Sequence, residues 1–175
     1  MNSDVKKFYK ITPEQIERNE YFSNNAFQFM IESLDDLSKN IKENGGKLIL
    51  FYGDNENIIN KYIKKHNIDA VYFNGDITPY ALKRDKDIKK MCDKIKIPVI
   101  ISQDYYLYEP GSITTNGQIY TKFTPYYLKA IKYNIKKPVI MRSYHFIKIN
   151  DGNINLRDAY FKFTVPNNNI LVNGG

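Results

Sequence analysis

Cysteine and long apolar runs are scarce in this 175-residue sequence, and each scarcity excludes a class of protein. The one cysteine, Cys92, excludes an internal disulfide bond and fits a reducing compartment. No run of about 18 apolar residues is present, so we expect no membrane-spanning helix. The N-terminal stretch MNSDVKKFYKITPEQ lacks the apolar core of a signal peptide. The sequence therefore predicts a soluble, intracellular protein.

Signatures of the common catalytic and metal centres are also missing. The two histidines, His66 and His145, have no partner at helical or hairpin spacing, so no metal-binding cluster is predicted. Neither a dinucleotide-binding glycine fingerprint nor a P-loop occurs, and no serine lies in a nucleophile elbow. Chemistry that depends on these centres is therefore not expected of the chain.

Positive charge and tyrosine, by contrast, are abundant. A formal net charge of +7 permits contact with nucleic acid or other anions without demonstrating it. Lysine pairs such as Lys64–Lys65 and Lys89–Lys90 recur on the polar sides of expected helices, which favours a solvated face. The 15 tyrosines are able to stack on bases, but most of them fall at positions expected to lie in the core.

Hydrophobic periodicity predicts an alternating α/β fold in a chain long enough for one domain with a real core. Buried strands are expected at 47–52, 70–73 and 98–102. Helices are expected over 24–44, from Asp54 or Asn55 to His66, and over 78–95. Strands and helices that alternate at this spacing predict βαβ units, a parallel sheet and right-handed crossovers.

The second half of the sequence has weaker periodicity. Residues 105–127 are irregular, with turns at Pro110–Gly111 and Asn116–Gly117. A short helix is expected from Thr124 through Tyr133. From Ile135 onward the sequence predicts an extended linker that needs something to pack against.

Three aspartates follow expected strands at their carboxyl ends: Asp54, Asp76 and Asp104. Because open α/β sheets bind ligands at the carboxyl ends of their strands, these side chains are candidates to line one crevice. The alternative is that they cap helices or turns. Asp76 lies within VYFNGDITPYALKRD, residues 71–85, where a strand runs through a turn into a helix capped by Thr78.

Five segments, taken in order over nearly the whole chain, carry a resemblance to a known family. They are ITPEQIERNEYFSNNAFQFMIESLDDL, GGKLILFYG, VYFNGDITPYALKRD, PGSITTNGQIYTKFTPYY and NILVNGG. Together they resemble the N-terminal α/β domain of the DNA photolyase and cryptochrome family. The class I cyclobutane pyrimidine dimer photolyases are the nearest branch.

The resemblance implies a Rossmann-like antenna domain, a parallel sheet with flanking helices that holds a light-harvesting chromophore such as a folate or a deazaflavin. In the family the chromophore passes excitation to FAD in a C-terminal helical domain, and that FAD splits pyrimidine dimers in DNA. The candidate chromophore-binding residues are Asn74, Asp76, Thr78, Arg84 and Asp104. For Arg84, local pairing with Asp85 that stabilises the domain is the alternative.

Departures from the family pattern occur at both ends. The FAD domain of the family would begin where this sequence stops, at Gly174–Gly175, and the sequence has no tryptophan for the family's electron path. We therefore expect no catalytic residue and no FAD on this chain. The family's first strand and its arginine-rich turn are missing too, and only the tail of the second strand is expected, at residues 5–11. Without that first strand, backbone groups of neighbouring strands need cover.

The predicted organisation is thus an antenna domain at residues 1–134 and a remnant of the interdomain linker at residues 135–175. The leading hypothesis is a truncated photolyase-like protein that has no repair activity alone and meets DNA only indirectly. One alternative is a non-catalytic subunit of a split photolyase, in which a companion chain supplies the missing strand and the FAD domain. The other is a generic nucleotide-binding α/β module.

Overall fold

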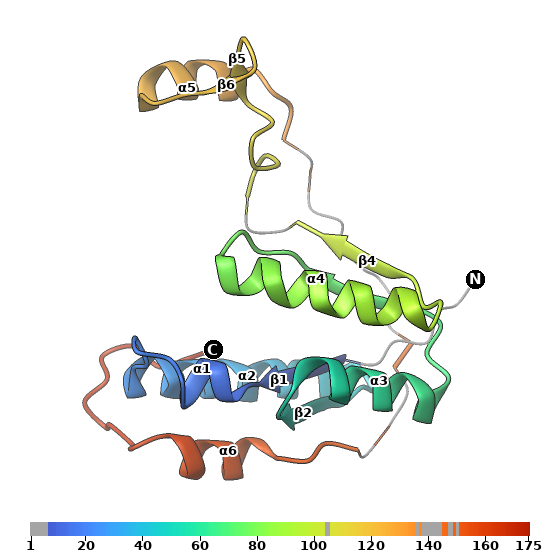
Figure 1. Cartoon of the computed structure of the whole chain (residues 1–175). Coiled ribbons are helices and arrows are strands. Elements are labelled where there is room, and N and C mark those ends of the chain that lie inside the picture. Colours follow the sequence, from blue (N-terminus) through green and yellow to red (C-terminus); the bar gives the residue numbers. More distant parts are fainter. Residues whose placement is uncertain (1–6, 104–105, 136, 138–144, 147–148, 150) are drawn as a thin grey trace. The chain divides into compact units, whose positions relative to one another are not determined.

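The computed structural model describes residues 7–103, 106–135, 137, 145–146, 149 and 151–175 (Figure 1). The chain divides into two compact units. The first unit comprises Met1–Ile59 and Met141–Gly175, and the second unit comprises Asn60–Ile140. Parallel strands alternate with helices along the chain, so the predicted α/β fold is confirmed.

The first unit begins with a parallel strand pair. Strand β1 (Lys7–Ile11) pairs with β2 (Leu48–Tyr52), with Ile11 opposite Tyr52. The strand predicted within residues 5–11 is therefore present. Helix α1 (Pro13–Ile16) follows at once, and it opens with a capping box in which Thr12 and Gln15 each bond the other's backbone N–H.

Helix α2 (Asn24–Glu43) supplies most of the core of this unit. Ser23 caps its first turn by accepting a hydrogen bond from the N–H of Ala26, and Gly45, at φ +80°, ends it in a left-handed conformation that suits glycine. The buried face of α2 packs against the strands and the later helix α6 (Leu156–Phe163). The core residues are Ile11, Phe27, Ile31, Leu34, Ile41, Leu48, Leu50 and Ala159.

Helix α6 corrects the expectation of an extended linker after residue 135. Asn155 caps this helix, and Ala159 is fully buried against the core of the first unit. The same segment covers the outer edge of β2, because the Asn153 side chain bonds both the N–H and the C=O of Tyr52, at 2.7 and 2.8 Å. Eight residues make about two helical turns, too few for their apolar period to stand out among the flanking asparagines and glycine.

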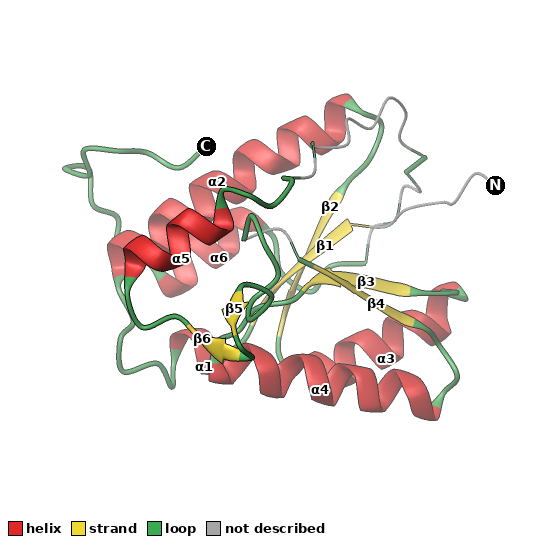
Figure 2. Cartoon of the chain, turned by 90° about the horizontal axis from the view of Figure 1, so that it is seen from above, coloured by secondary structure: helices red, strands yellow, loops and turns green. Residues whose placement is uncertain are grey.

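Helix α3 (Asn55–His66) begins in the first unit and ends in the second. The second unit contains strand β3 (Val71–Asn74), which pairs in parallel with β4 (Val99–Ser102). Helix α4 (Pro79–Lys94) connects them and runs alongside the pair (Figures 1 and 2). Cys92 lies on the buried face of α4 with no exposed surface, and burial raises the pKa of its thiol, as expected of a core cysteine.

The rest of the second unit is a hairpin and a helix. Strands β5 (Thr114–Thr115) and β6 (Gln118–Ile119) are antiparallel around Asn116–Gly117, and both turn residues have positive φ, as a tight hairpin requires. Helix α5 (Phe123–Ala130) lies beside the hairpin (Figure 1). The sequence predicts that this helix starts at Thr124, and it starts one residue earlier, at Phe123. Its N-cap residue is Lys122, whose side chain makes no capping hydrogen bond.

None of the helices in the described ranges is long and apolar enough to cross a membrane.

Candidate functional site

The turn between β3 and α4 holds most of the predicted site residues. Asn74 ends β3 opposite Ser102, and the N–H of Gly75 donates to the carbonyl of Ser102 at 2.8 Å. A Cβ at Gly75 would lie 2.9 Å from side-chain atoms of both Ile101 and Gln103, closer than such atoms approach. Glycine therefore lets the turn lie directly against β4.

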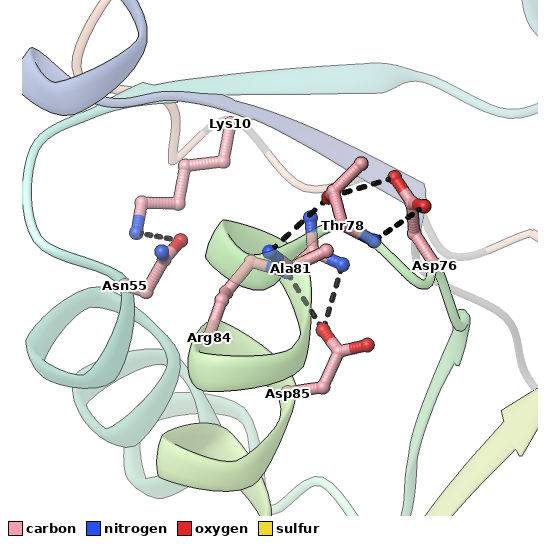
Figure 3. Close-up of polar contacts among 7 residues, drawn as sticks. All are labelled: Lys10, Asn55, Asp76, Thr78, Ala81, Arg84 and Asp85. Carbon is pink, nitrogen blue, oxygen red and sulfur yellow. Dashed lines mark hydrogen bonds and ion pairs between the residues drawn. The ribbon is translucent and has the colours of Figure 1, made fainter.

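Asp76 and Thr78 build the entry to α4 (Figure 3). The Asp76 carboxylate accepts hydrogen bonds from the N–H and the hydroxyl of Thr78, at 3.1 and 3.3 Å. Thr78 Oγ1 in turn accepts from the N–H of Ala81 at 3.4 Å, and Pro79 takes the first helical position. A cap of this kind stabilises a helix by about 1 kcal/mol. Asp76 and Thr78 thus make the capping bonds that the alternative supposed, and a role for either in binding a chromophore stays a prediction.

Arg84 pairs with its neighbour in the sequence. Its Nε and one terminal nitrogen lie 2.7 and 2.6 Å from the same carboxylate oxygen of Asp85 (Figure 3). The side chain of Asp85 is only 10% exposed, whereas that of Arg84 is 28% exposed. The local pairing considered for Arg84 is therefore present, and a role for Arg84 in binding a chromophore stays a prediction.

For the other two aspartates, the predicted shared crevice stays a prediction. Asp54 belongs to the first unit, where its carboxylate accepts from the N–H of Asn57 at 2.9 Å and caps α3. At the same end of α3, Lys10 Nζ donates to the Asn55 side chain (Figure 3). Asp104 lies outside the described residues. Within the described ranges no three His, Cys, Asp or Glu side chains form a metal-binding group.

A cavity of about 750 Å³ lies entirely within the second unit, and we call it the tyrosine pocket. Ile77 of the β3–α4 turn contributes to it, which places the pocket next to Asp76 and Thr78 in the chain. The rest of its wall comes from the loop before β5, from α5 and from the residues after α5. The lining residues are Ile77, Tyr106, Leu107, Tyr108, Glu109, Pro110, Gly111, Ile113, Tyr126, Tyr127, Ala130, Ile131, Tyr133 and Ile135.

Four tyrosines of the pocket lie outside the core. Tyr106, Tyr126, Tyr127 and Tyr133 all line the pocket and are exposed, and Tyr127 has half of its surface open to solvent. The pocket floor is apolar and buried, at Ile113 and Ala130. The sequence contains an indication of this pocket. Tyrosines are frequent in the irregular stretch 105–133, which has no periodic core pattern to account for them.

Backbone contacts shape the walls of the tyrosine pocket. Gly111 has φ +78°, and the N–H of Ser112 donates to the carbonyl of Glu109 at 3.0 Å, which closes a turn around Pro110. Lys129 Nζ donates to the carbonyl of Thr114 and so ties α5 to β5. The described lining offers a small molecule an aromatic surface together with the carboxylate of Glu109.

Comparison with known proteins places the chain in a family. The family model described as DNA photolyase matches residues 2–140. The deoxyribodipyrimidine photo-lyase of Alkalihalophilus pseudofirmus is 30% identical over 126 residues, which make up 71% of this chain and 25% of that protein. Cryptochrome-1 of Aedes aegypti is 28% identical over 127 residues, 71% of this chain and 23% of that protein.

A solved structure agrees with these relatives. The crystal structure of the archaeal photolyase from Sulfolobus tokodaii, described as containing two FAD molecules, matches with a TM-score of 0.84 and 30% identity. The match covers 98% of this chain and 38% of that one. The chain thus spans about a quarter of the curated relatives it matches. Since the family model covers most of its length, the chain belongs to the DNA photolyase family and corresponds to its N-terminal α/β domain.

Proposed function

We propose that this chain acts as the light-harvesting antenna domain of a photolyase-type DNA repair system and binds a chromophore that absorbs near-ultraviolet or blue light. The observation that carries the proposal is a pocket large enough for a cofactor, lined by tyrosines, within a domain of the photolyase family. The description of the Sulfolobus tokodaii structure implies a novel light-harvesting cofactor in that protein, which supports the same role here.

In this proposal the chain does not split pyrimidine dimers by itself. The dimer-splitting chemistry of class I photolyases is assigned to an FAD-bearing helical domain, and the aligned region covers 38% or less of the relatives named above. The chromophore is a folate, a deazaflavin or a flavin, and its excitation passes to FAD held elsewhere.

The first test is the absorbance of the purified chain at wavelengths above those of tyrosine. We expect a band from a bound chromophore, or a rise in melting temperature when a folate, deazaflavin or flavin is added, because a ligand that binds only the folded state stabilises it. Absence of both the band and the shift would contradict the antenna role. A shift with adenine nucleotides alone would favour a generic nucleotide-binding module instead.

A second candidate function is that of a non-catalytic subunit in a split photolyase. Exposed apolar side chains in the second unit favour it: Tyr72 on β3 is 71% exposed, and Leu128 on α5 is also exposed. Exposed apolar side chains mark an interaction site where they gather into a patch. Co-purification from the native source would recover a companion chain that carries an FAD-binding domain. A stable monomer that recovers no companion would argue against a subunit role.

A further inference from the structure

We infer that the tyrosine pocket binds the flat, uncharged ring system of a heteroaromatic chromophore. The inference rests on the proposed antenna function and adds where the ring binds and which chemistry it has. It differs from the prediction based on sequence, which placed the chromophore at the β3–α4 turn through Asn74, Asp76, Thr78 and Arg84.

Size and surface chemistry both fit a fused ring. About 750 Å³ lies within the range of small-molecule sites and holds a two- or three-ring system. Tyrosine rings at Tyr106, Tyr126 and Tyr127 supply flat surfaces for stacking, and Ile113 and Ala130 supply an apolar floor. Tyr108 and Tyr133 already meet edge to face, with ring centroids 6.1 Å apart, and so define one wall.

Charge in the pocket selects against an anionic group. Among the described residues that line the pocket there is no lysine or arginine, although the chain as a whole carries a formal charge of +7. The carboxylate in this described lining is that of Glu109, an exposed side chain. A carboxylate accepts hydrogen bonds from the N–H groups on the edge of a pyrimidine-containing ring, and it repels phosphate. A phosphate or glutamate tail therefore extends out of the pocket.

The polar side chains of the β3–α4 turn and of the first turns of α4 already make hydrogen bonds or ion pairs within the protein. Asp76 bonds Thr78, Thr78 caps α4, and Arg84 pairs with the mostly buried Asp85. A ligand at that turn would compete with these bonds. A ring in the tyrosine pocket breaks none of them and covers aromatic surface that is otherwise open to water, which is the favourable direction for apolar burial.

The test measures binding of riboflavin, a neutral three-ring probe, to the whole chain by fluorescence titration. Riboflavin is expected to bind, and FMN, which adds a phosphate, is expected to bind no more tightly. Tyr126→Ala and Tyr127→Ala are each expected to weaken binding about tenfold, the size of one lost aromatic stack. Tyr126→Phe retains the stacking surface and is expected to bind as the unchanged chain does.

Two further variants serve as controls. Tyr21→Ala removes a tyrosine that is 90% exposed in the first unit and is expected to leave riboflavin binding unchanged. Asp76→Ala removes a side chain that is not itself part of the pocket lining, although its neighbour Ile77 is, and it is expected to weaken riboflavin binding less than threefold. Circular dichroism confirms that each variant is folded.

The outcomes separate the pocket from the proposed function. If Asp76→Ala loses riboflavin binding while Tyr126→Ala and Tyr127→Ala keep it, the tyrosine pocket is not the binding site. The proposed antenna role would not be affected by that result. Riboflavin binding that is lost in Tyr126→Ala and Tyr127→Ala would support the pocket site. A rise in melting temperature with a folate or a deazaflavin that persists in both variants would support the antenna role without the pocket site. No binding of riboflavin or FMN to the unchanged chain would overturn the pocket site outright.

Discussion

The polar side chains at the start of α4 make hydrogen bonds within the protein itself. Asp76, Thr78 and Arg84 look like binding residues in the sequence because a polar turn after a strand is where α/β proteins hold ligands. In the structure each is hydrogen-bonded to a residue one to three positions away in the sequence. The sequence identifies the turn correctly, but the same residue types suit both capping and binding, so it does not separate the two roles.

The Arg84–Asp85 pair is expected to contribute to stability. Arg84→Ala leaves a mostly buried carboxylate without its partner and is expected to lower the free energy of unfolding by about 2 kcal/mol, less than for a fully buried pair because Arg84 is partly exposed. Urea unfolding measures the change. Lys89→Ala is the matched control on the same helix, because it breaks the exposed Lys89–Asp93 pair and is expected to cost about 0.5 kcal/mol or less. Equal losses in both variants would contradict the structural role of Arg84.

Tyr52 is expected to make stability depend on pH in the alkaline range. Its hydroxyl donates a hydrogen bond to Glu17, and this bond, with burial and the Glu17 charge, raises the pKa of Tyr52 to about 12 from 10.0. The folded state therefore holds the phenol proton more tightly than the unfolded state does. The resulting stability is present below pH 10 and is lost as pH rises towards 12.

The measurement compares urea unfolding of the unchanged chain and of Tyr52→Phe between pH 8 and pH 12, a range chosen to span about two units on either side of the unperturbed pKa of about 10. The other tyrosines titrate in both proteins, so the difference between the two curves isolates Tyr52. A constant difference across this range would show that the Glu17 contact does not perturb the phenol.

Among the elements, those with strong local signals match their predictions. Ser23 and Thr78 mark helix starts and Gly45 marks a helix end, because capping depends on a few adjacent residues. Strands β2, β3 and β4 come from apolar runs, and their bounds agree with the predicted ones to within one residue. Periodicity does not predict helix α6, because its stability depends on contact with the distant helix α2. It does not predict the tyrosine pocket either, because residues 106–135 form it mostly from irregular loops.

The contact between α6 and α2 is expected to be tightly packed. Ala159 has no exposed surface and belongs to the core cluster with residues of α2. Ala159→Leu adds three carbon atoms to this site and is expected to destabilise the protein by about 1–3 kcal/mol through overpacking. Thermal unfolding monitored by circular dichroism measures the loss.

Phe161 provides the comparison for this helix because its side chain is 65% exposed on the same element. Phe161→Ala is expected to change stability by about 0.5 kcal/mol or less. If Ala159→Leu lowers stability no more than Phe161→Ala does, α6 does not pack closely against α2.

For the whole molecule, the predicted domain boundary differs from the boundaries of the two compact units. The sequence prediction separates an antenna domain at residues 1–134 from a linker at residues 135–175, and that assignment of roles stays a prediction. In space, the C-terminal segment belongs with the N-terminal one, because Gln28 bonds the backbone of Asn167 and Glu32 accepts from the N–H of Gly174. Sequence periodicity reports which face of an element is buried but not which distant segment buries it.

The first unit is thus assembled from the two ends of the chain, and this has a consequence for its synthesis. Strands β1 and β2 and helix α2 leave the ribosome long before residues 151–175, which cover the edge of β2 and pack on α2. Contacts so distant in sequence form slowly, and surfaces that wait for them are exposed to aggregation. This unit therefore completes its folding only after residues 151–175 have been translated, and until then the edge of β2 and the face of α2 that they cover are open to solvent.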